Sequence, residues 1–301
     1  MSTKEGSLGA PTRHPIDWSN PNFVDEKLLD DELRRVFDIC HGCRRCFNLC
    51  ESFPKLFDYI DDSKSGELDT VSSDKFKDVV DACTLCDMCF LTKCPYVPPH
   101  EFNIDFPHLM LRYRVAERKK GKNNLVDDQL TKTDRNGKFF SKFSNLANWS
   151  TKTSNKITRP VMEMLLKIDK EAELPKFYKK TLIDQIDVNK QTTKKDKGKV
   201  IIFPTCFVNY NNPELGLLTK KILDKLEIYN EFFYNSCCGM PQLEGGDIES
   251  VSQKALDTSL KLKNFIDEGY TILSIVPSCT LMLKFEWPLL LPNNKDVKRL
   301  G

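Results

Sequence analysis

Eight of the twelve cysteines lie in two short runs, and their spacing is the feature of the chain that could do chemistry. Each run places three thiols at C-x2-C-x2-C and adds a fourth a few residues later. The first run comprises Cys40, Cys43, Cys46 and Cys50, and the second comprises Cys83, Cys86, Cys89 and Cys94. This spacing is typical of thiolates that bind [4Fe-4S] clusters. Because a cubane cluster takes four thiolates at tetrahedral corners, three from one tight loop leave one iron to be bound from elsewhere.

The fourth ligand of each cluster is expected from the opposite run, as in ferredoxins that hold two clusters. The first cluster is therefore predicted on Cys40, Cys43, Cys46 and Cys94. The second is predicted on Cys83, Cys86, Cys89 and Cys50. The sequence thus indicates two [4Fe-4S] clusters whose ligand sets are interleaved.

Zinc and disulfide bonds are the alternative interpretations of cysteine-rich runs. Zinc ribbons bring their ligands as C-x2-C pairs, so the third cysteine of each run would be a surplus thiolate. Disulfides form in oxidising compartments, and residues 1–18 contain no apolar segment of the kind found in a secretory signal. Iron-sulfur clusters are favoured, and a zinc-stabilised interaction protein is kept as the minor alternative.

The two runs belong to an internal repeat in which Cys40 aligns with Cys83. In both copies, apolar residues three and four apart precede the first cysteine, which predicts a helix with one buried stripe leading into each cluster loop. Asp31 and Ser73 are the predicted N-caps of these helices. Two such copies around two clusters predict an α-helical ferredoxin fold rather than the small β-hairpin type.

The charges beside the predicted ligands differ between the two runs. Cationic side chains flank the first cluster, namely His41, Arg44, Arg45 and Lys93, whereas Glu51 and Asp87 flank the second. Reduction adds one negative charge to a cluster, and nearby cations stabilise it. The Cys40 cluster is therefore predicted to have the higher potential and to receive electrons from the Cys83 cluster.

Composition sets outer limits on function. The formal net charge of +2 predicts no general affinity for nucleic acid. Polar residues and a proline interrupt the longest apolar stretch, residues 271–283, so no transmembrane helix is predicted. The segment from Arg112 to Lys199 is nevertheless basic, with 23 Lys and Arg against 11 Asp and Glu. It predicts helices and polar linkers, either as a solvated spacer, which is favoured, or as a basic face for anionic lipid or an acidic partner.

The last third of the sequence alternates strands with helices. Strands are predicted at residues 200–203, 228–233 and 271–276, with helices at 213–226 and 248–267 between them. In the first helix, Asn212 is the predicted N-cap before Pro213, and one helix face is apolar, made by Leu215, Leu218, Ile222 and Leu226. This order predicts a parallel sheet with right-handed crossovers. The remaining cysteines, Cys206, Cys237, Cys238 and Cys279, follow the carboxyl ends of the strands, where such sheets bind ligands.

Three segments around these cysteines resemble the cysteine-rich CCG domain of heterodisulfide reductase. They are Pro204-Thr205-Cys206, Cys237-Cys238-Gly239-Met240-Pro241 and Pro277-Ser278-Cys279. Together with the two cluster runs, the arrangement is similar to the heterodisulfide reductase-related family of iron-sulfur oxidoreductases, which includes the iron-sulfur subunit of anaerobic glycerol-3-phosphate dehydrogenase. The resemblance implies an electron-transfer subunit that works with a flavoprotein dehydrogenase and delivers electrons to a quinone or disulfide acceptor.

The sequence departs from this family pattern in two ways. Met282 stands where the fuller CCG pattern has its last cysteine. Relatives commonly carry two CCG domains, and this chain stops about where the second would begin, so it is interpreted as a truncated reading frame or a fragment. The four CCG-type cysteines are predicted to hold a third centre, iron-sulfur rather than zinc. Reduced thiols, or a redox-active pair that handles disulfides directly, are the alternatives.

The prediction as a whole is an α+β multidomain protein. It has an N-terminal extension (residues 1–30), an α-helical ferredoxin domain (31–110), a basic helical connector (111–198) and a CCG domain with a parallel sheet (199–301). The predicted function is an electron-transfer subunit with a flavoprotein partner, and a disulfide reductase is the alternative. The expected location is the cytoplasm, with a peripheral contact to the inner face of the membrane for quinone reduction.

Overall fold

The computed structural model describes residues 11–122, 125–186 and 198–301, and the chain divides into two compact units. Unit 1 contains the described residues up to 122 together with the segment Leu243–Ile248, and unit 2 contains the rest. The division into four segments made from the sequence stays a prediction. Helix α4 (Phe106–Lys119) continues through the boundary that was predicted at residue 110.

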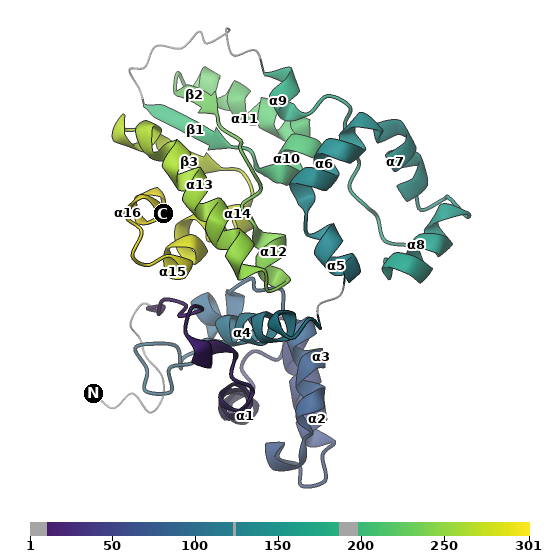
Figure 1. Cartoon of the computed structure of the whole chain (residues 1–301), viewed down its shortest axis with the longest axis vertical. Helices are drawn as coiled ribbons and strands as arrows, with labels where there is room; N and C mark the ends of the chain where they lie inside the picture. The colour runs from purple at the N-terminus through teal and green to yellow at the C-terminus, as the bar shows by residue number, and fades with distance from the viewer. Residues whose placement is uncertain (1–10, 123–124, 187–197) are drawn as a thin grey trace. The chain divides into compact units, whose positions relative to one another are not determined.

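Unit 1 is helical. Its elements are η1 (Pro21–Val24), α1 (Glu26–Cys43), α2 (Ser52–Asp61), η2 (Leu68–Thr70), η3 (Ser73–Lys75), α3 (Phe76–Asp81), the π-helical turn η4 (Cys89–Lys93) and α4 (Figure 1). Helix α1 packs against α2 and α4, and α2 packs against α3. Aromatic rings fill the space between these helices: the centroids of Phe53 and Phe106 are 4.7 Å apart, and those of Phe37 and Phe76 are 5.1 Å apart. This aromatic core fixes the helices that lead into the two cysteine loops.

The predicted N-caps of the repeat are wrong, for local reasons. Helix α1 begins at Glu26, and its cap is Asp25, whose carboxylate accepts a hydrogen bond of 2.8 Å from the Leu28 amide. Asp31 therefore lies inside the helix. In the second copy, Ser73 is part of the 3-10 turn η3 that precedes the short helix α3. The two copies of the repeat thus differ in how their helices start.

Unit 2 contains one three-stranded parallel sheet in the order β2-β1-β3. The strands are β1 (Lys199–Phe203), β2 (Tyr229–Phe232) and β3 (Thr271–Ser274). Ile201 pairs with Glu231 of β2 and with Ile272 of β3. Strand β1 is central and its last three residues are fully buried. The predicted parallel sheet is confirmed.

Helices make up the rest of the elements in the described chain after residue 124. They are α5 (Leu125–Leu130), α6 (Thr133–Lys142), α7 (Ser144–Thr151), α8 (Thr158–Leu166), α9 (Leu182–Gln185), α10 (Thr205–Tyr210), α11 (Pro213–Lys225), α12 (Met240–Glu244), α13 (Ile248–Asp267), α14 (Pro277–Leu281), the π-helical η5 (Met282–Glu286), α15 (Trp287–Leu290) and α16 (Lys295–Leu300). The Asn212 cap of α11 is confirmed, because its side chain accepts from the Leu215 amide. Helices α5 to α9 belong to the same compact unit as the sheet (Figure 1).

Candidate metal centres

The first cysteine loop surrounds a pocket at the end of α1. Cys40 and Cys43 come from the last turn of this helix, which stops because Arg44 adopts a left-handed conformation (φ 52°) and its amide donates to the Cys40 carbonyl. Cys46 lies in the turn that follows, and Cys94 follows η4. The four cysteines line one pocket that is partly open to solvent. Arg45, Phe53 and Tyr96 complete its wall.

The second cysteine loop surrounds a second pocket. The thiols of Cys83, Cys86 and Cys89 line it together with that of Cys50 from the first run. Leu85 and Asp87 adopt left-handed conformations (φ 48° and 60°), which non-glycine residues rarely do. These two turns curl the backbone of the loop that carries Cys83, Cys86 and Cys89. Such strained residues collect at functional loops.

Each pocket therefore gathers the four thiols that the sequence assigned to one cluster, including the cysteine taken from the opposite run. Across the described residues, no group of three or more His, Cys, Asp or Glu is arranged to hold a single metal ion. A cubane differs in this respect, because each of its thiolates binds a different iron and the sulfur atoms are correspondingly spread out. Which thiol binds which iron stays a prediction.

The electrostatics of the thiols fit a cationic cofactor. Burial, and then the neighbouring Cys94, Cys46 and Cys43, raise the pKa of Cys40 well above its ordinary value. Burial and the same kind of crowding raise the pKa of Cys46 to about 12, and burial raises that of Cys83 to about 11. Four crowded thiols can ionise together only if positive charge compensates them, and bound iron supplies that charge. The donor set of each pocket thus fits an iron-sulfur cluster.

An ion-pair network beside the second pocket was not anticipated from the sequence. Arg13 donates to both carboxylate oxygens of Asp87, at 2.5 and 2.9 Å, and to both of Asp105, at 2.8 and 3.0 Å. Its guanidinium lies 4.7 Å from the centre of the Phe90 ring. The side chains of Arg13 and Asp87 are only 9% and 2% exposed. Asp105 also caps α4 by accepting from the His108 amide.

The charges beside the first pocket are arranged differently. Arg44 turns outward and pairs with Asp61, and His41 contacts the same carboxylate at 3.1 Å. Hydrogen bonds from Arg44 and His41 lower the pKa of Asp61 to about 2. About half of the side-chain surface of Arg44 and of Asp61 is exposed. Of the cations predicted to flank this cluster, Arg45 is the one that lines its pocket.

The four CCG-type cysteines meet at one end of the sheet in unit 2. Cys206 is on α10, directly after β1, and Cys279 is on α14, after β3. The sulfur atoms form two close pairs: Cys206 and Cys237 at 3.5 Å, and Cys238 and Cys279 at 3.1 Å. The thiols of Cys206 and Cys238 donate to Cys237 and lower its pKa, whereas the pKa values of Cys206 and Cys238 are raised. The structure brings together all four residues predicted for this site.

Two further residues at this site lie outside the cysteine motifs. Asp134 of α6 accepts the Cys237 amide hydrogen bond at 2.7 Å and also the hydroxyl of Tyr234. Burial and the Asp134 carboxylate raise the pKa of Tyr234. Met282 is fully buried. A helix of the predicted connector therefore holds the Cys237 backbone in place.

A family model for the CCG cysteine-rich domain matches residues 200–284, which span β1 to η5 and all four of these cysteines. This part of the chain is thus similar to a CCG domain. The chain is also similar to a subunit of the anaerobic glycerol-3-phosphate dehydrogenase of Escherichia coli K12, with 29% identity over 173 residues. The match covers 57% of this chain and 43% of that relative.

A second relative is citrate utilization protein B of Escherichia coli, 30% identical over 96 residues, which are 31% of this chain and 23% of that protein. The aligned regions thus cover less than half of the length of each curated relative. No solved structure matches the chain. Over the described parts of the chain, no helix has both the length and the hydropathy needed to cross a bilayer.

Proposed function

We propose that this protein is an iron-sulfur electron-transfer subunit of an oxidoreductase complex. The observation that carries the proposal is the pair of pockets in unit 1, each lined by four thiols drawn from both cysteine runs. Similarity to a dehydrogenase subunit and the CCG domain support the same role. Residues Cys40, Cys43, Cys46 and Cys94 would hold one [4Fe-4S] cluster, and Cys83, Cys86, Cys89 and Cys50 the other.

Each cluster, when bound, would take up and release one electron at a time. The chain itself supplies an apolar, water-excluding wall between the two pockets. Phe53 lines both of them and is only 2% exposed. Its ring packs on Phe106, which lines the second pocket. The two cluster sites therefore share a side chain, a geometry suited to transfer from one to the other.

The partners are part of this proposal. A flavoprotein dehydrogenase would supply the electrons, and a quinone or a disulfide would accept them. The relative's name describes it as one subunit of a dehydrogenase, which supports an assembly with other subunits. A quinone acceptor would require peripheral contact with a membrane.

A third centre at Cys206, Cys237, Cys238 and Cys279 is also proposed, with iron-sulfur chemistry preferred to zinc. The two close sulfur pairs favour a second candidate function, disulfide reduction at these residues. In that reaction the Cys237 thiolate would attack a substrate disulfide and release one substrate thiol, and Cys206 would then attack the mixed disulfide at Cys237 and release the second. The resulting Cys206–Cys237 disulfide would then need two electrons from the clusters.

Anaerobic purification followed by iron, sulfide and zinc analysis tests the proposal. We expect about eight irons or more per chain, with matching acid-labile sulfide. Zinc without iron would support the interaction-protein alternative instead. The Cys237→Ser variant separates the two redox functions, because loss of disulfide reduction with both unit 1 clusters intact would favour the reductase.

A further inference from the structure

Helices α6, α7 and α8 expose an unusual amount of apolar surface to solvent. Nine large apolar side chains between residues 139 and 165 are 37–74% exposed: Phe139, Phe140, Phe143, Leu146, Trp149, Ile157, Val161, Met164 and Leu165. The three helices have only eight to ten residues each, so none could span a bilayer. Helix α6 contacts α7, and α7 contacts α8, so these side chains lie on neighbouring helices. Exposed apolar side chains gathered in this way favour an interaction site.

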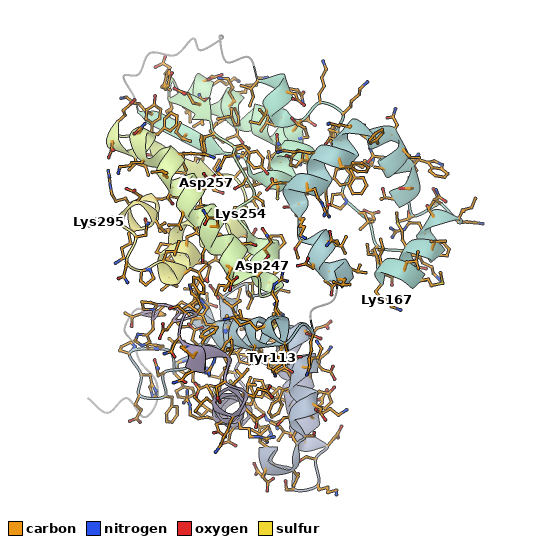
Figure 2. All side chains as sticks on the ribbon, in the orientation of Figure 1. Tyr113, Lys167, Asp247, Lys254, Asp257 and Lys295 are labelled. Atoms are coloured by element: carbon orange, nitrogen blue, oxygen red, sulfur yellow. The ribbon has the colours of Figure 1, made fainter. Side chains whose placement is uncertain are left out.

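The charged residues on this segment are almost all cationic. Between residues 135 and 168 there are seven Lys and Arg, and Glu163 is the one acidic residue. Five lysines, exposed like the apolar residues, are interspersed with them: Lys138, Lys142, Lys152, Lys156 and Lys167. Figure 2 shows Lys167 at the end of α8. The surface therefore combines aromatic and aliphatic side chains with positive charge.

Specific contacts behind the surface hold these helices in place. Arg159 is 1% exposed, and its guanidinium donates to the carbonyls of Lys170, Asp169 and Ala172. The side-chain amide of Asn148 donates to the Phe177 carbonyl, and its oxygen accepts from the Phe177 amide, both at 2.8 Å. The segment that follows α8 is thus tied to the inner side of α7 and α8.

Helix α6 is anchored to the CCG domain at two points. Gly137 faces the ring of Tyr210 so closely that an added Cβ would clash with it. One turn earlier, Asp134 holds the Cys237 amide. The apolar residues consequently point outward while the opposite side of α6 is engaged in packing. Their exposure follows from these anchors, because the side of the helix that faces the domain is already occupied.

We propose that this surface of α6–α8 binds the headgroup region of an anionic lipid bilayer. Helices that lie in that region place Trp, Phe and Leu at the acyl boundary and Lys among the anionic headgroups. Both halves of that pattern are present here, and the charge complements anionic lipid. An acidic protein partner would explain the lysines but would also need one complementary groove for nine exposed apolar side chains.

This inference rests on the proposed function. It identifies the surface through which the protein would contact the membrane that holds a quinone acceptor. Lipid binding itself needs no redox reaction and can be measured without one. Iron analysis can therefore contradict the electron-transfer role while vesicle binding holds. Conversely, vesicle binding can be absent from a protein that holds its iron. The two proposals can fail separately.

Co-sedimentation of the full chain with vesicles tests the inference. We expect binding to vesicles that contain phosphatidylglycerol, weaker binding to phosphatidylcholine alone, and a further decrease at high salt. The triple variant Phe143→Ser, Leu146→Ser, Trp149→Ser should lower the partition coefficient by about tenfold or more, because three apolar side chains are lost from the interface. Leu260→Ser on α13 is the matched control, since Leu260 and Leu146 are both 64% exposed, and it should bind like the parent.

Changing Lys138, Lys142 and Lys152 to Gln should remove the preference for anionic vesicles and leave the residual binding insensitive to salt. Circular dichroism of every variant checks that it is folded. Absence of binding to anionic vesicles, or equal losses in the Leu260 control and the triple variant, would overturn the inference. So would a triple variant that binds vesicles normally but no longer associates with a dehydrogenase subunit, which would assign the surface to a protein partner.

Discussion

The two cysteine loops share the C-x2-C-x2-C spacing, but the ion pairs beside them differ greatly in burial. Beside the first pocket, Arg44 and Asp61 form an ion pair at the surface, and each of the two side chains is about half exposed. Beside the second, Arg13 and Asp87 form an ion pair that is almost completely buried. Exposed pairs contribute little, whereas breaking a buried pair leaves an uncompensated charge in a medium of low dielectric constant. The duplicated sequence thus places two similar ligand sets in surroundings that respond very differently to change.

The comparison also revises the charge difference predicted for the two clusters. Formal charge alone counted four cations near the first and two acids near the second. In the structure, Arg44 and His41 are engaged with Asp61, and Arg13 offsets Asp87. Arg45 remains at the wall of the first pocket and Asp87 at that of the second. The higher reduction potential of the Cys40 cluster stays a prediction, but the expected difference between the two potentials is smaller.

The side chain that the two pockets share should give the largest effect. Phe53→Ala should lower the free energy of unfolding of unit 1 by about 3–5 kcal/mol, because a buried ring in contact with Phe57 and Phe106 is lost. Both clusters should become labile together, measured as iron retention during gel filtration. Loss of iron from one site alone would mean that the ring does not serve both loops.

Removing the buried cation should affect one loop only. Arg13→Gln leaves Asp87 and Asp105 without their bidentate partner, and the cost should be about 3 kcal/mol of stability. The midpoint potential of the Cys83 cluster should fall, because a positive charge that favours reduction is gone. Spectroscopic redox titration measures this change. A variant with both potentials unchanged would contradict the role given to Arg13.

Lowering the pH should also affect the stability around the two loops differently. Burial alone would raise the pKa of Asp105, but His108 and Arg13 hold that pKa well below its ordinary value. The stability that this carboxylate contributes is fully present above its unfolded pKa of about 3.9 and is lost as the pH falls through the lowered folded pKa. Urea titrations of the parent and Asp105→Asn should therefore differ at pH 7 and converge in acid. The same comparison with Asp61→Asn should show a smaller difference, because Asp61 is exposed.

The exposed pair should give the smallest effect. Arg44→Gln should leave the stability of unit 1 nearly unchanged, since water solvates Asp61 when its partner is removed. The potential of the Cys40 cluster should shift less than that of the Cys83 cluster does in Arg13→Gln. A larger shift from Arg44 than from Arg13 would reverse the comparison.

The sequence predicts which cysteines come together better than it predicts their surroundings. The type and local spacing of the cysteines indicate their chemistry. The strands and helices of the last third can be predicted because their apolar periodicity is also local. Arg13 meets Asp87 across 74 residues, and Asp134 meets Cys237 across 103, with no local signal for either contact. Such partners are fixed only by tertiary packing.

The exposure of apolar side chains is equally hard to predict from the sequence. Leu215, Leu218, Ile222 and Leu226 form an apolar face in the sequence of α11, yet they are 36–59% exposed in the structure. On α11 it is instead Gly216 that packs closely, against Leu182 of α9. Helical periodicity shows which residues share a face, but it does not show whether another element covers that face.

Interleaved ligation is the central claim, and a reciprocal pair of variants tests it most directly. Iron content and electron paramagnetic resonance spectra of anaerobically prepared Cys94→Ser and Cys50→Ser should show loss of one cluster in each. Cys94→Ser should lose the cluster built on Cys40 and retain the one built on Cys83, and Cys50→Ser should do the reverse. If Cys94→Ser instead destroys the Cys83 cluster and spares the Cys40 cluster, each run binds its own cluster and the account is wrong.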